Sequence, residues 1–196
     1  MSNPHLETQI FVDEKVNAFK FKNEYSLYNE TGEVIGSIHQ LLSTWEKIRK
    51  LIIVSQKLTP FQYEIRNAQG EVIAEIKKGW TFWLPKIQLV MNDAVIGVIH
   101  QRFKLIKPKF DIYDENNQLI GSIKGNWSQW QFDITSDKGI ELGQVSKKWA
   151  GIAKELFTTA DKYIVNIEPG VQDEKMRMLV LSAALTIDLV LKEQGQ

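Results

Sequence analysis

One short pattern of apolar and polar positions recurs five times along the chain. In each copy an apolar residue is followed by Gly or Ala, a β-branched residue stands two positions later, and a bulky apolar residue stands four positions beyond that. The last four copies are spaced by about 23 residues, which suits a hairpin with its connection. The copies begin at Val34, Val72, Val95, Leu119 and Glu141.

A run of alternating apolar and polar residues precedes each copy, as in Tyr25–Tyr28 and Phe110–Tyr113. This period of two, with Tyr, Phe, Ile and Val at the apolar positions, is typical of half-buried antiparallel strands. Segments rich in Asn, Asp and Gly separate each run from its copy, and these residues tolerate the left-handed backbone of tight turns. The pattern therefore predicts five hairpins, or ten strands.

The two faces of each hairpin differ in polarity. The small residue, the β-branched residue and the bulky residue of a copy share one face, which we expect to lie toward the core, Trp80 included. The other face is mostly polar and should be solvated. A small residue on the core face leaves room for a close neighbour.

The best candidate for that neighbour is the segment Lys175–Glu193, which has almost no polar face. Such a helix is either a core helix or a membrane span. The uncharged stretch between Arg177 and Asp188 is roughly ten residues, whereas a bilayer requires about 20. We therefore favour a buried core helix over one that inserts into a membrane. Its core residues are expected to be Met178, Leu181, Ala184, Leu185 and Asp188.

Composition narrows the choice of function. Lys plus Arg and Asp plus Glu both number 24, so the formal charge is zero and bulk attraction to nucleic acid is not expected. The chain has no cysteine, which excludes disulfides, thiolate metal sites and thiol catalysis.

We expect a single domain over residues 1–196, with 1–8 as a loose N-terminal tail. The first residues lack the pattern of a signal peptide, so we expect a cytoplasmic protein.

The last fifty residues carry a recognisable series of motifs. The run Lys148–Tyr163, with Lys175-Met176 and Ile187-Asp188 after it, is close to the series K-x-W-x-G, E-x-F-T-x-A-D, K-M and I-D. In this series the chain resembles the phospholipid scramblase family, and with it the LURP-one-related proteins and the C-terminal domain of tubby proteins.

That resemblance implies a mainly β, tubby-like fold. Its members form a closed antiparallel barrel of about twelve strands around a central hydrophobic C-terminal α-helix. Two strands beyond the five hairpins are then expected, one within Gln9–Lys22 and one at Tyr163–Ile167.

No catalytic constellation stands out. His39 and His100 occupy the same place in two copies, but both fall on the polar face, and His5 is the remaining histidine. We interpret them as solvated strand residues rather than metal ligands. The sequence has no nucleophile elbow, phosphate loop or nucleotide fingerprint, so an enzyme is not expected.

The calcium-binding segment of the resembled family would fall on residues 158–173. Asp161 and Asp173 are the candidate ligands. Thr159 stands where the family shows Asp, and the segment lacks the Gly that a sharply bent calcium loop uses. We expect a strand and a turn here, with weak calcium binding as the alternative and no other cofactor.

Two segments combine cations with apolar residues and are candidates for contact with lipid. In the first, Trp83 is expected to point outward beside Lys86, an arrangement suited to a membrane interface. In the second, cations alternate with apolar residues and would reach lipid phosphates. Its cations are Arg102, Lys104, Lys107 and Lys109. Ordinary solvated strand ends are the alternative for both segments.

The expected function is non-catalytic binding of phospholipid headgroups at an anionic membrane surface, from the cytoplasmic side. The resemblance also implies phospholipid scrambling, although a barrel filled by its own helix offers no obvious path for a headgroup. The alternative is a soluble interaction scaffold that binds another protein and has no lipid role. No nucleic acid partner is expected.

Overall fold

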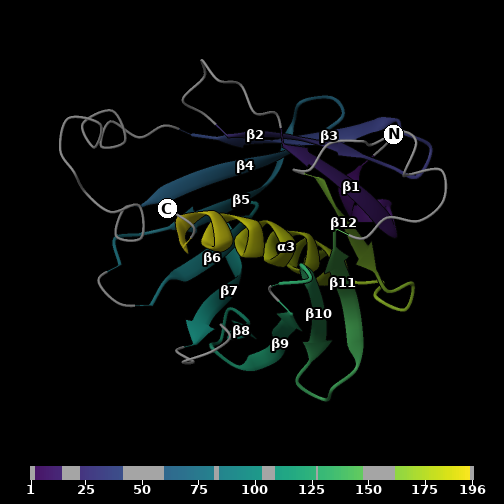
Figure 1. Ribbon diagram of the computed structural model, residues 1–196. Coiled ribbons are helices and arrows are strands. Elements are labelled where there is room, and N and C mark those ends of the chain that lie inside the picture. Colours follow the sequence, from purple (N-terminus) through teal and green to yellow (C-terminus); the bar gives the residue numbers. More distant parts are fainter. Residues whose placement is uncertain are drawn as a thin grey trace.

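The computed structural model describes residues 3–14, 23–41, 60–81, 84–102, 109–126, 128–147 and 162–194. Within them, twelve antiparallel strands close into one barrel around the helix α3 (Glu174–Gln194) (Figure 1). The closed, mainly β barrel implied by the resemblance is confirmed. The strands are β1 (Gln9–Glu14), β2 (Glu24–Tyr28), β3 (Val34–Gln40), β4 (Phe61–Asn67), β5 (Val72–Lys78), β6 (Lys86–Met91), β7 (Ala94–Arg102), β8 (Lys109–Tyr113), β9 (Leu119–Asn126), β10 (Gln131–Ser136), β11 (Glu141–Ser146) and β12 (Lys162–Ile167).

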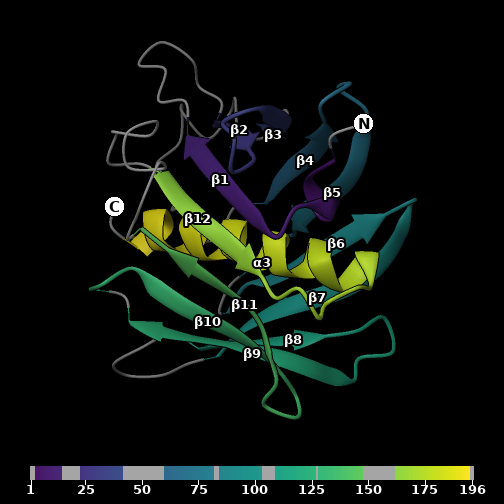
Figure 2. The ribbon, with the colours of Figure 1, turned by 90° about the vertical axis from the view of Figure 1, so that its right-hand side faces the viewer.

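Strands that follow one another in the sequence are neighbours in the barrel, and β1 closes it by pairing with β12. Phe11 lies opposite Ile164 in this closing pair. Figure 2 shows β1 and β12 side by side across the helix. Both strands are expected beyond the five hairpins, and their pairing leaves the sheet without a free edge.

The turns within the hairpins follow from their sequences. The side-chain oxygens of Asn29, Asn67 and Asp114 each accept backbone N–H groups from the residues two and four positions later, at 2.8–3.1 Å. Gly32 and Gly70 have φ of 81° and 85°, a left-handed conformation that suits a residue without Cβ. The tight turns predicted from Asn, Asp and Gly are therefore present.

Each hairpin contains a β-bulge at the same place in the repeat. Leu27 pairs with Gly36, but the next residue, Tyr28, pairs with Val34, so Ile35 is an extra residue on β3. Because two successive residues oppose one, both Ile35 and Gly36 are buried and the strict alternation is broken. The corresponding extra residues in the other hairpins are Ile73, Ile96, Ile120 and Leu142.

Two of the small residues make room for the helix, as predicted. A Cβ at Gly97 would lie 2.5 Å from Cδ2 of Leu179, and one at Gly143 would lie 2.8 Å from Cγ1 of Val180. Gly36 instead lies under Pro4, whose Cγ would be 2.8 Å from an added Cβ. At Gly36, Gly97 and Gly143 the small residue thus admits the element that covers the barrel wall, whereas a Cβ at Gly121 would meet only the neighbouring strands.

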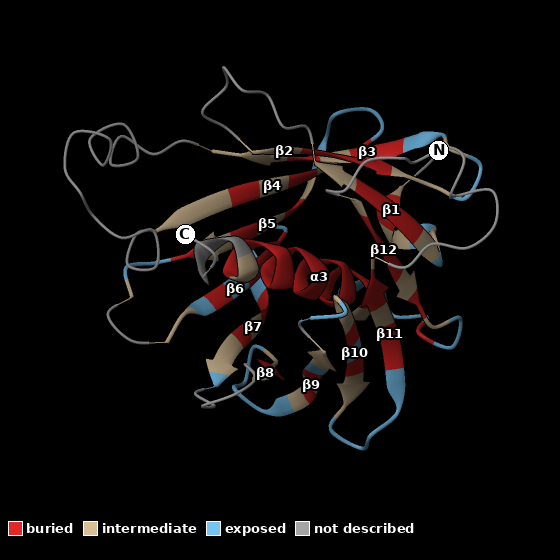
Figure 3. Ribbon diagram, viewed as in Figure 1, coloured by how far each residue is buried: buried red, intermediate tan, exposed pale blue. Residues whose placement is uncertain are grey.

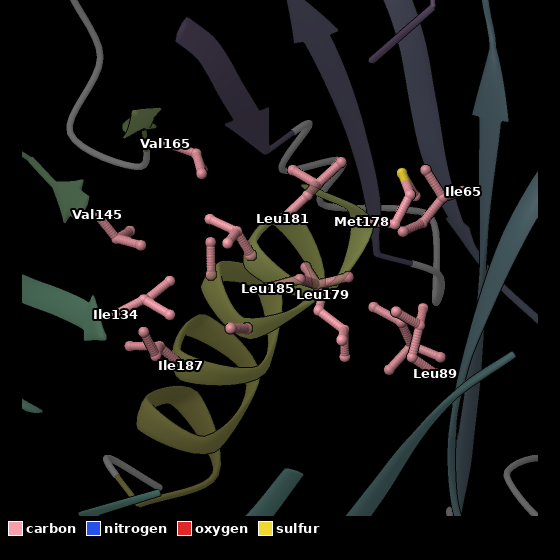
Figure 4. Packing of buried hydrophobic residues seen from close by; sticks show 14 of the residues in the cluster. Ile65, Leu89, Ile134, Val145, Val165, Met178, Leu179, Leu181, Leu185 and Ile187 are labelled. Atoms are coloured by element: carbon pink, nitrogen blue, oxygen red, sulfur yellow. The ribbon is translucent and has the colours of Figure 1, made fainter. Parts of the chain in front are cut away.

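The helix α3 fills the barrel interior. It is buried from Arg177 to Val190 (Figure 3), and its apolar side chains lie between Ile65 and Leu89 on one side and Ile134 and Val145 on the other (Figure 4). Within the described residues, no helix combines the length and the apolar character needed to cross a bilayer. All five predicted core residues are buried, namely Met178, Leu181, Ala184, Leu185 and Asp188.

Polar side chains are nevertheless present in this interior. The hydroxyl of Tyr25 donates a hydrogen bond to Oδ2 of Asp188 at 3.0 Å. The buried hydroxyls of Tyr163, Ser182 and Thr186 have no hydrogen-bond partner among the residues that the structure describes. Burial, reinforced by the charge of Asp188, raises the pKa of Tyr25 and of Tyr163 well above 10. Both tyrosines therefore stay protonated at neutral pH.

Residues 3–8 are docked on the barrel, unlike the loose tail predicted for residues 1–8. The short 3-10 helix η1 (Pro4–Leu6) buries Pro4. Arg177, near the start of α3, donates to the carbonyls of His5, Glu7 (2.6 Å) and Val171 (2.8 Å). These acceptors are backbone oxygens, most of them distant in sequence, so side-chain patterns give no sign of the contact.

The barrel has two unlike ends. The turn end carries the five hairpin turns (29–33, 67–71, 92–93, 114–118 and 136–140) and the connection 168–173 from β12 to the start of α3. The loop end is where β1, β3, β5, β7, β9 and β11 finish and where β2, β4, β6, β8, β10 and β12 begin. The C-terminal end of α3 points toward the loop end (Figure 1).

Candidate functional site

Side chains on the outer face of β6, β7 and β8 form a basic surface at the loop end. Strand register places Lys86 opposite His100, His100 opposite Asp111, and Arg102 opposite Lys109. Paired residues point to the same side of a sheet, as do residues two apart on one strand. The structure thus brings together three of the predicted lipid-contacting residues, Lys86, Arg102 and Lys109, from three strands.

Asp111 links two of these cations. Its Oδ2 accepts a hydrogen bond from Nε of Arg102 at 2.6 Å, and its Oδ1 lies 3.2 Å from Nζ of Lys109. Asp111 is only 4% exposed, and burial alone would raise its pKa. The interactions with Arg102 and Lys109 outweigh burial and lower the pKa of Asp111 below its ordinary value. Two cations share one carboxylate, so the cluster retains a net positive charge.

His100 is the titratable member of the surface. Its ring centroid lies 4.7 Å from that of Tyr113, whose hydroxyl accepts a hydrogen bond from Nη2 of Arg102 at 2.7 Å. Partial burial, followed by the positive charges of Lys86 and Arg102, lowers the pKa of His100 below its ordinary value of 6.5. The imidazole is therefore mostly neutral at pH 7 and offers one hydrogen-bond donor and one acceptor.

Beside Lys86 the surface is hollowed into a groove of about 660 Å³, here named the β6–β7 groove. Trp80 is 52% exposed and lines it, so the core position expected for Trp80 is wrong. The reason is that β5 ends at Lys78, and the strand alternation that underlies the expectation does not continue past Gly79. The lining residues are Gly79, Trp80, Thr81, Leu84, Lys86, Gln88, Val98, His100 and Asn117.

Lys86 supplies the charge of the β6–β7 groove. It is exposed, and it forms no ion pair with any residue that the structure describes. Trp80, Leu84 and Val98 contribute apolar surface to the same groove. An available ammonium group next to apolar side chains suits an amphiphilic anion better than a purely polar one.

A second hollow, of about 410 Å³, shares Gly79 and Gln88 with the β6–β7 groove. Its two lysines are already engaged. Lys77 forms an ion pair with Glu75, and Lys78 is buried with Nζ 4.9 Å from the centroid of the Phe61 ring. Burial and pairing make these cations less available to a ligand than Lys86.

Three of the predicted lipid-contacting residues, Trp83, Lys104 and Lys107, lie outside the described residues and stay predictions. Sequence analysis missed Asp111, which neutralises part of the charge of Arg102 and Lys109. Lys109 and Asp111 are two apart and so share a face, which is a signal that the sequence does carry. Their pairing with β7 has no such signal, because no tight turn fixes the register of β7 and β8.

Of the two calcium candidates, Asp173 lies in the part of the chain that the structure describes. Oδ2 of Asp173 accepts a hydrogen bond from the backbone N–H of Met176 at 2.8 Å, which is the geometry of a helix N-cap. Asp161 lies outside the described residues. Among the described side chains, no group of three or more His, Asp or Glu is placed to hold a metal ion. Calcium binding therefore stays an untested alternative.

Comparisons with known proteins agree on one family. A family model described as Scramblase matches residues 6–194. Phospholipid scramblase 1 of Rattus norvegicus is 29% identical over 204 residues, which cover 96% of this chain and 59% of the rat protein. Phospholipid scramblase 1 of Homo sapiens is 31% identical over 118 residues, which cover 56% of this chain and 37% of the human protein. The chain thus spans less than two thirds of the length of these relatives.

A solved structure shares the fold. The X-ray structure of a protein from Arabidopsis thaliana superposes with a TM-score of 0.55 and covers 96% of both chains. The sequence identity is 8%, so this likeness concerns the fold alone.

Proposed function

This chain belongs to the Scramblase family, and we propose that it binds phospholipid headgroups at a membrane surface through the β6–β7 groove. The observation that carries the proposal is the placement of Lys86, a cation without an ion pair among the described residues, next to the exposed Trp80. The relatives that are named phospholipid scramblases supply the class of ligand. The binding requires no bond-making chemistry and no metal.

The groove matches the chemistry of a phospholipid in two parts. A lipid phosphate carries negative charge and accepts hydrogen bonds, which Lys86, His100 and Gln88 are placed to donate. The glycerol and upper acyl region is apolar, and Trp80 and Leu84 offer a surface for it. Tryptophan is enriched at membrane interfaces because one part of its ring system is apolar and its N–H is polar.

The cluster of Arg102, Lys109 and Asp111 adds long-range attraction. Its two cations and one carboxylate leave a net positive charge beside the groove. A cation near an anionic membrane contributes about 1 kcal/mol of attraction. We therefore assign the cluster the role of drawing anionic headgroups to the surface, while Lys86 makes the direct contact.

The proposal is limited to contact at the surface of the protein. The interior of the barrel is occupied by α3, whose residues from Arg177 to Val190 are buried. Movement of a headgroup through the barrel would require α3 to leave it. We propose a peripheral membrane protein at the cytoplasmic face, and lipid transfer between leaflets is not needed for its binding role.

Vesicle flotation tests the proposal. The protein is expected to float with phosphatidylcholine vesicles that contain phosphatidylserine and to remain at the bottom with phosphatidylcholine alone. Replacing Lys86 by Gln should weaken flotation about fivefold, since one near-surface cation is worth about 1 kcal/mol. Lys138→Gln, at an exposed turn-end position, is the matched control and should float like the parent. A parent that never floats would favour the protein-binding scaffold instead.

A further inference from the structure

The formal net charge of the chain is zero, but its charged residues are distributed unevenly between the two ends of the barrel. The turns and the connection that make up the turn end contain a single cation, Lys138. Within the described residues, no carboxylate of these segments forms an ion pair. Their nine carboxylates are Glu30, Glu33, Glu71, Asp93, Asp114, Glu115, Asp137, Glu168 and Asp173.

The loop end has the opposite sign. Among the described residues, the two positions of each strand nearest this end, together with Lys147, carry seven cations and three carboxylates. The carboxylates are Asp13, Glu14 and Glu24. Glu75 and Asp111, further along β5 and β8, pair with Lys77 and with Arg102 and Lys109, and including them still leaves more cations than carboxylates. The cations are Lys77, Lys78, Lys86, Arg102, Lys109, Lys147 and Lys162. Because the whole chain has a formal charge of zero, attraction to a charged surface depends on which end approaches it.

The two ends are far enough apart to act separately. The six-residue strand β10 spans about 20 Å at ~3.3 Å per residue. Charges in solution are screened over about 8 Å at physiological ionic strength. A surface that touches one end therefore interacts with the charges of that end and hardly at all with those of the other.

We infer that the barrel docks end-on, with the loop end against an anionic phospholipid membrane and the turn end facing away from it. The inference rests on the proposed function, and it deepens that function by naming the docking surface and the orientation. With the loop end toward the lipid, the cations gain attraction while the nine carboxylates stay beyond the screening length. The opposite orientation brings those carboxylates against lipid of the same sign.

Exposed aliphatic side chains at the turn end favour the opposite orientation. Exposed aliphatic side chains follow the hairpin turns, and insertion of such groups into a bilayer is favourable. They are Val34, Val72, Val95, Leu119 and Ile140. However, Glu33 and Glu71 directly precede two of them, and Glu141 directly follows Ile140. Inserting the aliphatic groups would therefore press carboxylates into an anionic surface, which the basic loop end avoids.

A pair of single-cysteine variants tests the orientation, because the chain has no cysteine of its own. Gln129→Cys places a label in the β9–β10 connection at the loop end, and Gln69→Cys places one in the β4–β5 turn at the turn end. Both positions are exposed glutamines, so the substitutions are chemically matched. Each variant carries the same uncharged fluorophore and is bound to phosphatidylcholine–phosphatidylserine vesicles that contain a headgroup spin-labelled lipid as a short-range quencher.

The expected result is quenching several-fold stronger for the label at residue 129 than for the label at residue 69. Equal quenching, or stronger quenching at residue 69, overturns the end-on orientation. Flotation of both labelled proteins is measured in parallel and separates the two proposals. Flotation with the wrong quenching order rejects the orientation alone, whereas absence of flotation rejects the proposed function and the orientation with it.

A second measurement uses charge instead of labels. The double variant Glu30→Gln with Glu115→Gln removes two turn-end carboxylates and should change affinity for phosphatidylserine vesicles by less than twofold, because these groups lie beyond the screening length. An increase of about tenfold or more would place the turn end at the membrane and contradict the inference.

Discussion

The hydroxyl of Tyr25 on β2 donates to the carboxylate of Asp188 on α3 at 3.0 Å, in the interior of the barrel. A helix that is apolar on nearly all sides packs with similar energy in several rotations about its axis. A directional polar contact favours one of them, as single buried polar residues do in coiled coils. We therefore expect the contact between Tyr25 and Asp188 to help fix the orientation of the central helix in the barrel.

Two tyrosine substitutions should have opposite effects on stability. Tyr25→Phe removes a donor from the buried carboxylate of Asp188 and should lower the free energy of unfolding by about 1–3 kcal/mol. Tyr163→Phe removes a buried hydroxyl that has no hydrogen-bond partner among the described residues, and should raise it by about 1 kcal/mol. Urea unfolding of both variants checks the pair. A destabilised Tyr163→Phe protein would mean that the hydroxyl has a partner.

Stability should fall steeply above pH 10. The folded-state pKa of Tyr25 and of Tyr163 lies well above 10, mainly because of burial, whereas the unfolded chain titrates near 10. Below pH 10 both states are protonated and these groups add no pH dependence. Above it the unfolded state loses protons that the folded state keeps, so each tyrosine lowers the free energy of unfolding by about 1.4 kcal/mol per pH unit.

The alkaline loss is measured by urea unfolding at a series of pH values between about 9 and 11, on either side of the ordinary tyrosine pKa. Tyr163→Phe serves as its control and should show a shallower decline than the parent protein, since one buried tyrosine is missing. Identical slopes in the two proteins would show that Tyr163 does not contribute.

Enlarging the helix within the closed barrel should be costly. Ala184 is fully buried there, so Ala184→Trp overpacks the interior and should lower the free energy of unfolding by about 3 kcal/mol. Ala68→Trp, in the exposed β4–β5 turn, adds the same side chain at the surface and should change it by less than about 0.5 kcal/mol. Equal melting temperatures for the two variants would contradict a helix enclosed by the barrel.

Asp111→Asn should raise the affinity for anionic lipid and lower the stability of the fold. The substitution removes the carboxylate shared by Arg102 and Lys109, so flotation with anionic vesicles should increase several-fold. The melting temperature should fall, because the ion pairs are lost, at a cost of about 1 kcal/mol.

The stabilising effect of Asp111 depends on pH. Because the pKa of Asp111 is lowered in the folded protein, its carboxylate stabilises the fold above the ordinary pKa near 3.8, and this contribution is lost as the pH falls through the folded-state pKa. The two proteins should therefore converge in stability at strongly acidic pH.

Salt should weaken the binding of the parent protein. Raising the ionic strength to about 1 M shortens the screening length from about 8 Å to about 3 Å. Replacing Lys104, Lys107 and Lys109 together by Gln should have a similar effect, with a loss of roughly 3 kcal/mol or about a hundredfold in affinity if all three reach the lipid. Flotation of the triple variant that equals the parent at every salt concentration would exclude these lysines from the site.

The sequence is informative wherever a feature depends on neighbours along the chain. Asn29 and Gly32 specify their turn within a few residues. The apolar segment predicted as a helix agrees with α3 to within one residue at each end. Such features are local, so short-range patterns determine them.

Features that depend on register or on distant contacts do not follow from the sequence pattern. The bulge at Ile35 shifts the pairing by one residue, and a period-two pattern has no means of showing it. Asp111 meets Arg102 only because β7 and β8 pair in one register, and Arg177 reaches carbonyls about 170 residues away. In the candidate site the individual cations are evident from the sequence but the groove is not, because the path of the chain at Trp80 does not follow from alternation.

The pairing of β1 with β12 has a consequence for how the protein folds. Gln9 and Asn166 lie opposite each other across this seam, and their side chains form a hydrogen bond at 2.8 Å over a sequence separation of 157 residues. During synthesis, β1 cannot pair with β12 until β12 has left the ribosome, and the barrel cannot be filled until α3 has followed it. Until then the apolar faces of the nascent hairpins are open to water and to other chains. We therefore expect closure to be late and cooperative, and chaperones that shield apolar surface to matter more for yield than any single contact of the finished barrel.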